Sequence, residues 1–495
     1  MDGSREASAC KRQRTEVAGL SVSGSTSPGT LPGTVSVEVG GVMPKHEVGS
    51  TFLVPGLVIR EHRFTVPLDY SGSGPHCGKT ITIFARELMA PARNESLPWL
   101  VYLQGGPGFE APRMSEASMW VRPALNSHRV LLMDQRGTGR SAPITTTNLA
   151  LRGGPQEQAD YLAYFRADNI VNDCEVIRRL LVPSTCFGGK WAILGQSFGG
   201  FCATTYLSRA PDGLMEAMLT GGLPPGITVP CPAEAVYTAL HTRVANANAK
   251  FYERFPGDVE QVRRIVRYLA DQPGGGATLP DGTLLTPRLF QTLGLSGLGS
   301  GGGFERLHYL LDSFFDDEGN MTPSFAKAFD AWHSWDSNPL YALVHEAIYC
   351  QGGQASNWAA DRVRSREPFA SLFDATAAAN GGQTVMFTGE CVYRFMYDDV
   401  VALRPYKATA DLLAARADWQ PLYDGKALAA NKVPVAALAY VEDLYVDFNM
   451  SMETANAIRG IKVWATNEYR HSGIRDDGNR IFDRLLGMVR NVILD

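Results

Sequence analysis

The sequence predicts a doubly wound α/β fold whose mostly parallel sheet is interrupted by a large, mainly helical insertion. Three short apolar runs each end in a polar or glycine-rich turn, at 99–103, 130–133 and 191–194. Such continuous runs are typical of strands that are buried on both faces of a parallel sheet. Helical patterns lie between them, and sheet-like runs return at 433–440 and 461–465. The alternation predicts the fold class, and the long gap predicts the insertion.

The composition is that of an ordinary globular protein. The chain has 495 residues, of which 45% are hydrophobic and 20% charged, and this excludes a wholly disordered chain. The 46 basic and 51 acidic residues give a net charge of −5, so we expect no general binding to nucleic acid or to a membrane surface. No apolar run approaches the roughly 18 residues of a membrane span.

The cysteines and the N-terminus bear on cofactors and location. The eight cysteines are scattered, with no CxxC pair and no metal-type spacing to histidine. We read them as reduced thiols of an intracellular protein, and we expect no metal and no organic cofactor. The N-terminus carries charges where a secretory signal needs apolar residues, so we expect a cytoplasmic protein.

The first 223 residues are expected to contain a tail and the first part of the sheet domain. Residues 1–50 are rich in Ser, Gly, Thr and Pro without periodicity, which predicts a disordered tail. The sheet domain then begins, and its first part is expected at 51–223. Two segments of alternating polarity, 56–70 and 79–88, predict a hairpin at its start.

Residues 224–430 have a different character and predict a helical cap domain. Proline-rich joints lead into amphipathic helical patterns at 233–255 and 259–271. The glycine-rich stretch 273–303 predicts a flexible loop, and no apolar strand leads into it as a nucleotide-binding loop would need. The second part of the sheet domain is expected at 431–495, with a helix near its end.

The strongest chemical signal is the pentapeptide Gly195-Gln196-Ser197-Phe198-Gly199, which matches G-x-S-x-G. It follows a buried strand and precedes a helix, which is the context of a nucleophile elbow. The flanking glycines permit a tight, strained turn that exposes the serine hydroxyl. The pattern therefore predicts Ser197 as a catalytic nucleophile.

A serine nucleophile needs a base, and the base in turn needs an acid that orients it. Among nine histidines, only His471 lies beyond the returning sheet runs, where the base of such a fold belongs. The acid should follow the preceding strand, where Glu442, Asp443 and Asp447 share one loop. We expect Asp443 to be the acid, with Asp447 and then Glu442 as alternatives.

A second glycine-rich turn predicts an oxyanion hole. Gln104-Gly105-Gly106-Pro107-Gly108 follows the first buried strand and leaves backbone N–H groups exposed. Placed beside the elbow, Gly105 or Gly106 can donate one N–H, and Phe198 can donate the second.

Three motifs together resemble the proline iminopeptidases, which are α/β-hydrolases that remove an N-terminal proline from peptides. They are the QGGPG turn at 104–108, the run DQRGTGRS at 134–141 and GQSFGG at 195–200. They occur in the family's order and spacing, and the resemblance covers most of 51–224 and 433–485. The QGGPG turn begins with Gln where the family usually has His.

The resemblance implies that glutamates of the cap bind the substrate's amino group, for which Glu346 and Glu390 are the candidates. It also implies that Arg136 braces the active-site loops. Four aromatic residues near these acids could line a pocket for the proline ring or pack in the core: Tyr349, Phe387, Tyr393 and Phe395.

The expected activity is therefore acyl transfer, with small peptides that carry an N-terminal proline as substrates. Ser197 would attack the carbonyl of that proline, and His471 would pass the proton to the leaving amine. An esterase or amidase with the same triad is the first alternative. A hydrolase-like ligand receptor without turnover is the second.

Overall fold

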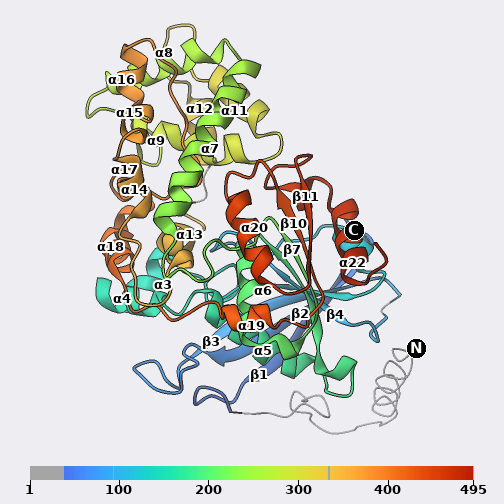
Figure 1. The fold of residues 1–495 in the computed structure, drawn as a ribbon. Helices are drawn as coiled ribbons and strands as arrows, with labels where there is room; N and C mark the ends of the chain where they lie inside the picture. The colour runs from blue at the N-terminus through green and yellow to red at the C-terminus, as the bar shows by residue number, and fades with distance from the viewer. Residues whose placement is uncertain (1–37, 93, 333–334, 494–495) are drawn as a thin grey trace.

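The computed structural model describes residues 38–92, 94–332 and 335–493, and it is built around a nine-stranded sheet (Figure 1). The strand order is β1-β2-β3-β5-β4-β6-β7-β10-β11. From β5 to β11 all neighbours are parallel, whereas β1, β2 and β3 run antiparallel to their neighbours. The strands are β1 Lys45–Val54, β2 Leu57–Pro67, β3 Thr80–Met89, β4 Trp99–Leu103, β5 Arg129–Met133, β6 Trp191–Gln196, β7 Leu214–Thr220, β10 Val435–Tyr440 and β11 Ile461–Thr466. The predicted mostly parallel sheet is confirmed.

The start of the sheet confirms one prediction and corrects another. β2 and β3 form the expected hairpin, with register from Val58 opposite Met89 to Pro67 opposite Thr80. The tail was expected to end at 50, but β1 already begins at Lys45 and pairs with β2. Almost all its side chains are exposed, so backbone pairing rather than burial holds this edge strand, and the polarity pattern carried no signal. Residues 1–37 of the expected tail lie outside the described residues.

Helices cover both faces of the sheet, which is why the central strands read as continuous apolar runs. Every residue of β4, β5 and β6 is buried. α5 (Ala167–Leu181) and α6 (Phe198–Arg209) pack in the apolar cluster on one face. α2 (Val121–Ala124) and α22 (Gly478–Val489) belong to the cluster on the other face.

The regular structure between β7 and β10 is mainly helical, and Figure 1 shows α7 running from the sheet into a lobe with α8, α11, α12 and α16. We propose that this segment is a cap domain, divided from the sheet domain near 224 and 430. Its helices are α7 Ala233–Arg254, α8 Asp258–Ala270, α9 Pro287–Phe290, α10 Gly294–Gly299, α11 Gly303–Asp312, α12 Pro323–Asp330, α13 Pro339–Val344, α14 Ala359–Arg364, α15 Phe369–Leu372, α16 Ala375–Asn380, α17 Met396–Asp399, α18 Lys407–Ala415 and α19 Gly425–Ala429. Besides α2, α5, α6 and α22, the α-helices outside it are α3 Thr146–Ala150, α4 Pro155–Leu162, α20 Phe448–Ala457 and α21 Gly473–Asp476.

The glycine-rich stretch 273–303 is folded, so the expected flexible loop is wrong. It contains the two-residue strands β8 (Ala277–Thr278) and β9 (Leu284–Leu285), then α9 and α10. Four apolar side chains anchor it with no exposed surface: Leu285, Phe290, Leu293 and Leu298. Its glycines permit close packing, since a Cβ on Gly294 would lie 2.2 Å from the carbonyl oxygen of Thr388.

Two further findings concern the whole of the described chain. No helix within the described ranges is long and apolar enough to cross a membrane.

Six cysteines are free thiols, namely Cys77, Cys174, Cys202, Cys231, Cys350 and Cys391. Cys186 is disulfide-bonded, which corrects the expectation of a thiol at that position.

Candidate active site

Ser197 stands on a strained turn between β6 and α6, as the pentapeptide predicts. Its φ of 54° and ψ of −124° lie outside the regions that non-glycine residues favour. The turn leaves no room for side chains on either side. A Cβ on Gly199 would lie 1.9 Å from the carbonyl oxygen of Leu103, and one on Gly195 would lie 2.4 Å from that of Gly199. The two glycines of the motif are therefore required sterically.

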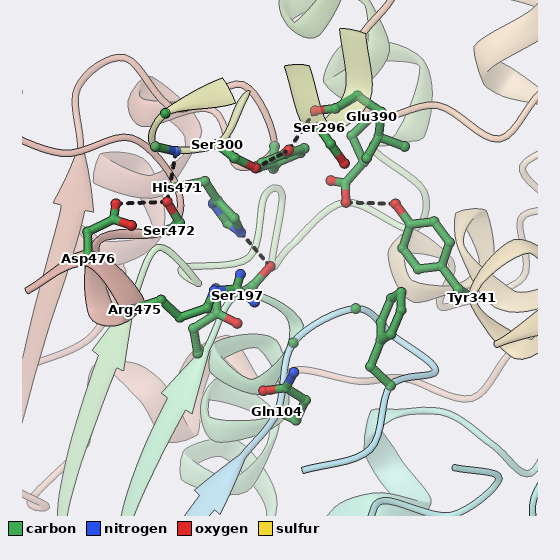
Figure 2. Close-up of a pocket in the computed structure, with 18 of the residues that line it drawn as sticks. Gln104, Ser197, Ser296, Ser300, Tyr341, Glu390, His471, Ser472, Arg475 and Asp476 are labelled. Atoms are coloured by element: carbon green, nitrogen blue, oxygen red, sulfur yellow. Dashed lines mark hydrogen bonds between the residues drawn. The ribbon is translucent and has the colours of Figure 1, made fainter. Parts of the chain in front are cut away.

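The structure brings Ser197, His471 and Asp443 into one hydrogen-bonded chain. His471 Nε2 lies 2.8 Å from Ser197 Oγ, and His471 Nδ1 lies 2.8 Å from Asp443 Oδ2 (the first contact is drawn in Figure 2). All three side chains are buried. Asp443 follows β10 and His471 follows the neighbouring parallel strand β11, so both emerge at the same edge of the sheet. This geometry can activate a serine hydroxyl.

Backbone groups fix the orientation of the Asp443 carboxylate. Its Oδ1 accepts hydrogen bonds from the N–H groups of Tyr445 and Val446, at 2.8 and 3.1 Å. The two alternative acids are turned elsewhere. Glu442 forms an exposed ion pair with Lys250, and Asp447 accepts a hydrogen bond from the N–H of Met450 at the start of α20. The structure therefore places only Asp443, of the three, beside His471.

The glycine turn after β4 lies directly against the elbow. A Cβ on Gly105 would come within 2.9 Å of Ser197 Cβ. Gly105 and Gly106 both line the cavity in front of Ser197. Phe198 is the first residue of α6, so its N–H has no partner within the helix. The residues that were expected to form an oxyanion hole are thus brought together around Ser197.

The run at 134–141 holds these loops in place. Gln135 Nε2 donates to the carbonyl oxygen of Gln104 at 3.0 Å, which ties it to the glycine turn. Arg136 is buried and donates to both oxygens of Asp173, at 2.8 and 2.6 Å. It also donates to the carbonyl oxygens of Leu68 and Tyr164. One guanidinium thereby joins α5, the loop before it and the residue that follows β2.

A cavity of about 790 Å³ opens in front of Ser197 and His471. The sheet domain supplies one wall, and the cap supplies the other (Figure 2). Apart from His471, its charged lining consists of Glu390, Arg306, Arg475 and Asp476. Its aromatic lining consists of Phe109, Trp332, Trp335, Tyr341 and Tyr445.

Glu390 is the carboxylate that the cap presents to this cavity. Its Oε1 accepts a hydrogen bond from the hydroxyl of Tyr341 at 2.9 Å (Figure 2). Burial raises the pKa of Glu390 to about 7, although the charge of His471 and the bond from Tyr341 both lower it. Near neutral pH this carboxyl is therefore poised between its acid and its anion, and a nearby cation would favour the anion.

Glu346 is not part of the cavity, which corrects the role expected for it. Its two oxygens accept hydrogen bonds from the N–H groups of Ala359 and Ala360, at 3.0 and 2.9 Å. These groups open α14 and have no partner within the helix, so a carboxylate satisfies them. Burial raises the pKa of Glu346. Its place in the structure is that of a helix cap inside the cap domain.

Of the two interpretations left open for the four aromatic residues, the structure excludes the lining of this cavity. None of the four candidates lines the cavity, and Tyr349, Phe387 and Tyr393 are buried in the core of the cap. The residues that do line it gave little signal. Tyr445 and Arg475 could have been noticed, because they closely follow Asp443 and His471 in sequence. For Trp332 and Tyr341 no local pattern points to the site.

The fold and this arrangement define a serine hydrolase with the α/β-hydrolase fold. The family model described as alpha/beta hydrolase fold matches residues 98–267. Proline iminopeptidase of Aeromonas sobria is 45% identical over 441 residues, covering 89% of this chain and 98% of the relative. A proline iminopeptidase of Aspergillus aculeatus is 36% identical over 434 residues, covering 86% and 93%.

The chain therefore belongs to the proline iminopeptidase, or prolyl aminopeptidase, family. Among solved structures, proline iminopeptidase of Mycobacterium smegmatis is 13% identical with a TM-score of 0.40, covering 86% of this chain and 97% of that one.

Proposed function

We propose that the enzyme releases N-terminal proline from small peptides through an acyl-enzyme on Ser197. The observation that carries this proposal is that the Ser197–His471–Asp443 chain and the Glu390 carboxylate of the cap meet at one cavity. The first suits acyl transfer, and the second suits a free ammonium group beside the reacting carbonyl.

The acylation step follows from the geometry of the triad. His471 takes the proton from Ser197 Oγ as the oxygen attacks the carbonyl of the N-terminal proline. Asp443 holds the imidazole in position and stabilises its positive charge. The N–H groups of Phe198 and of Gly105 or Gly106 stabilise the oxyanion that forms.

The tetrahedral intermediate then collapses. The C–N bond breaks, and His471 gives its proton to the leaving amine, so the shortened peptide departs. Water, deprotonated by the same imidazole, attacks the prolyl ester of Ser197. Free proline leaves, and the serine hydroxyl is restored.

Glu390 explains why the enzyme would cleave after an N-terminal residue, which carries a free ammonium group. A prolyl ammonium beside its carboxylate would form a charge-assisted hydrogen bond within a partly dehydrated pocket. An N-acylated proline carries no such charge and would leave the Glu390 carboxyl without a partner. The aromatic lining residues, among them Phe109 and Tyr341, offer apolar surface to the pyrrolidine ring.

The direct test compares three substrates on the purified full chain. They are proline p-nitroanilide, N-acetylproline p-nitroanilide and p-nitrophenyl acetate. Turnover of the free-amine substrate alone is expected. Equal turnover with and without the acetyl group would instead support an esterase or amidase with the same triad. Labelling by a fluorophosphonate without any turnover would support a receptor.

A further inference from the structure

We propose that Arg475 binds the C-terminal carboxylate of short substrates, so that the enzyme favours dipeptides and tripeptides with a free C-terminus. This inference rests on the proposed function, since it concerns the part of the peptide that follows the proline. It begins with the size of the cavity. About 790 Å³ is more than a prolyl residue fills, so the site can also enclose part of the leaving group.

The charges of the cavity give the substrate a direction. In Figure 2, Glu390 and Tyr341 lie on one side of Ser197, whereas Arg475, Ser472 and Asp476 lie on the other. With its ammonium at Glu390 and its carbonyl at Ser197, a peptide continues away from Glu390. Its next residues therefore extend toward Arg475.

The chemistry of the reaction leads to the same side. His471 must protonate the leaving amine, so the residue after the scissile bond has to lie next to its imidazole. Arg475 lies four residues further along, in α21, which follows directly from the loop of His471. His471, which protonates the leaving amine, and Arg475, which would contact the leaving peptide, thus lie in one short segment.

Arg475 is free to bind an anion. Within the part of the chain that the structure describes, its guanidinium has no hydrogen-bond or ion-pair partner. The residue is exposed, and Figure 2 shows its side chain extending toward Ser197. It also lies close enough to Tyr102 for its charge to oppose the rise that burial causes in the pKa of that phenol. A guanidinium binds a carboxylate through two parallel N–H donors.

Two other charged residues of the cavity, Asp476 and Arg306, are less suitable. Asp476 accepts a hydrogen bond from Ser472 Oγ at 2.8 Å, and that hydroxyl in turn accepts one from the N–H of Gly301. Its negative charge weakens anion binding nearby without removing it. Arg306 belongs to the cap, and its guanidinium lies 5.7 Å from the centre of the Trp332 ring. It is the natural comparison for Arg475.

The test measures proline release from Pro-Gly and from its amide, Pro-Gly-NH2, which lacks the terminal charge. We expect the wild type to prefer the free acid by about tenfold in kcat/KM, mostly through KM, because one charged contact is gained. Arg475→Gln should bring this ratio close to one, and Arg475→Lys should retain part of it. Arg306→Gln is the matched control and should keep the ratio. The Asp476→Asn variant should raise it.

Peptide length and salt provide a second readout that a merely structural effect would not produce. Each added residue moves the carboxylate by about 3.3–3.6 Å, so the preference should fade in peptides longer than three residues. It should also fall as salt is added, because the contact is exposed.

A wild-type ratio near one would overturn the inference, as would loss of the ratio in Arg306→Gln rather than in Arg475→Gln. Turnover of proline p-nitroanilide, which has no carboxylate, separates this result from a failure of the proposed function. If that substrate and both peptides are inert, the proposed function itself is wrong.

Discussion

The sheet domain and the cap supply opposite walls of one cavity, but they position their side chains by different means. On the sheet side, Ser197, Asp443 and His471 follow the ends of β6, β10 and β11. Neighbouring parallel strands end at the same edge, so the strand order alone brings these residues together. On the cap side, Glu390 lies in an irregular segment and Tyr341 on the short helix α13. Only tertiary packing brings that pair together.

This difference separates two kinds of function. The sheet positions the reacting atoms by backbone hydrogen bonds that extend across the domain, so chemistry on this wall is fixed by the fold. The cap wall is formed by short helices and loops, so recognition there can change with little effect on the sheet. Substitutions of the triad residues on the first wall should therefore abolish turnover, whereas those on the second should change which substrates are used.

Ser197→Ala provides the largest test of the sheet wall. It removes the nucleophile, so we expect kcat to fall by about 10⁶-fold with every substrate. Ser208→Ala on the same helix is the matched control, because the Ser208 hydroxyl has no hydrogen-bond partner among the described residues. Release of p-nitroaniline measures both. Substantial activity in Ser197→Ala would show that Ser197 is not the nucleophile, and the sheet wall would then not supply the reacting atoms.

Asp443→Asn should have the next largest effect, a loss of about 10⁴-fold in kcat, because the amide holds the wrong tautomer of His471. Asp447→Asn is the control, since asparagine still caps α20 and only the ion pair with Arg243 is lost. Its activity should stay within about twofold of wild type. The opposite order of the two losses would assign the acid to Asp447.

Substitutions of the two glutamates of the cap should have different effects, because only Glu390 lines the cavity. Glu390→Gln should lower kcat/KM for proline p-nitroanilide by about 100-fold, or ~3 kcal/mol, because the substrate ammonium loses its counter-charge. Glu346→Gln should instead lower the free energy of unfolding by about 1–3 kcal/mol, because one helix N–H group loses its acceptor. Kinetics together with thermal unfolding distinguish the two. A large kinetic loss in Glu346→Gln with an unchanged melting temperature would show instead that Glu346 contributes to substrate binding.

The same division explains what the sequence could predict. Ser197 is marked by its own neighbours, since strand, turn and helix are all local, and His471 is the one histidine beyond the returning strands. The acid was harder to choose, because Glu442, Asp443 and Asp447 share a loop. The contact with His471 distinguishes Asp443, and the bonds from the N–H groups of Tyr445 and Val446 orient its carboxylate.

In the cap the local signals were insufficient. Glu346 and Glu390 are both acids in an aromatic-rich region, and no pattern near Glu346 shows that α14 begins against it. Likewise, the glycines of 273–303 indicated a loop by composition. Whether a glycine marks flexibility or close packing depends on what lies opposite, as Thr388 does for Gly294.

The smallest and most specific prediction concerns Tyr341→Phe. The lost hydrogen bond should lower kcat/KM for proline p-nitroanilide by about fivefold at neutral pH, or ~1 kcal/mol. Because kcat/KM reports the free enzyme, it should rise with pH through about 7 in the wild type as Glu390 ionises.

The tyrosine hydroxyl favours the Glu390 anion and lowers its pKa, so its loss should move this rise to higher pH. Tyr445→Phe is the control, because the Tyr445 hydroxyl donates to the carbonyl oxygen of Leu295 rather than to Glu390. The pH profile should therefore stay in place in that variant and lose its Glu390 component in Glu390→Gln. If the profile does not move in Tyr341→Phe, then Glu390 is not the group whose ionisation admits the substrate, and recognition of the amine must come from the sheet wall as well.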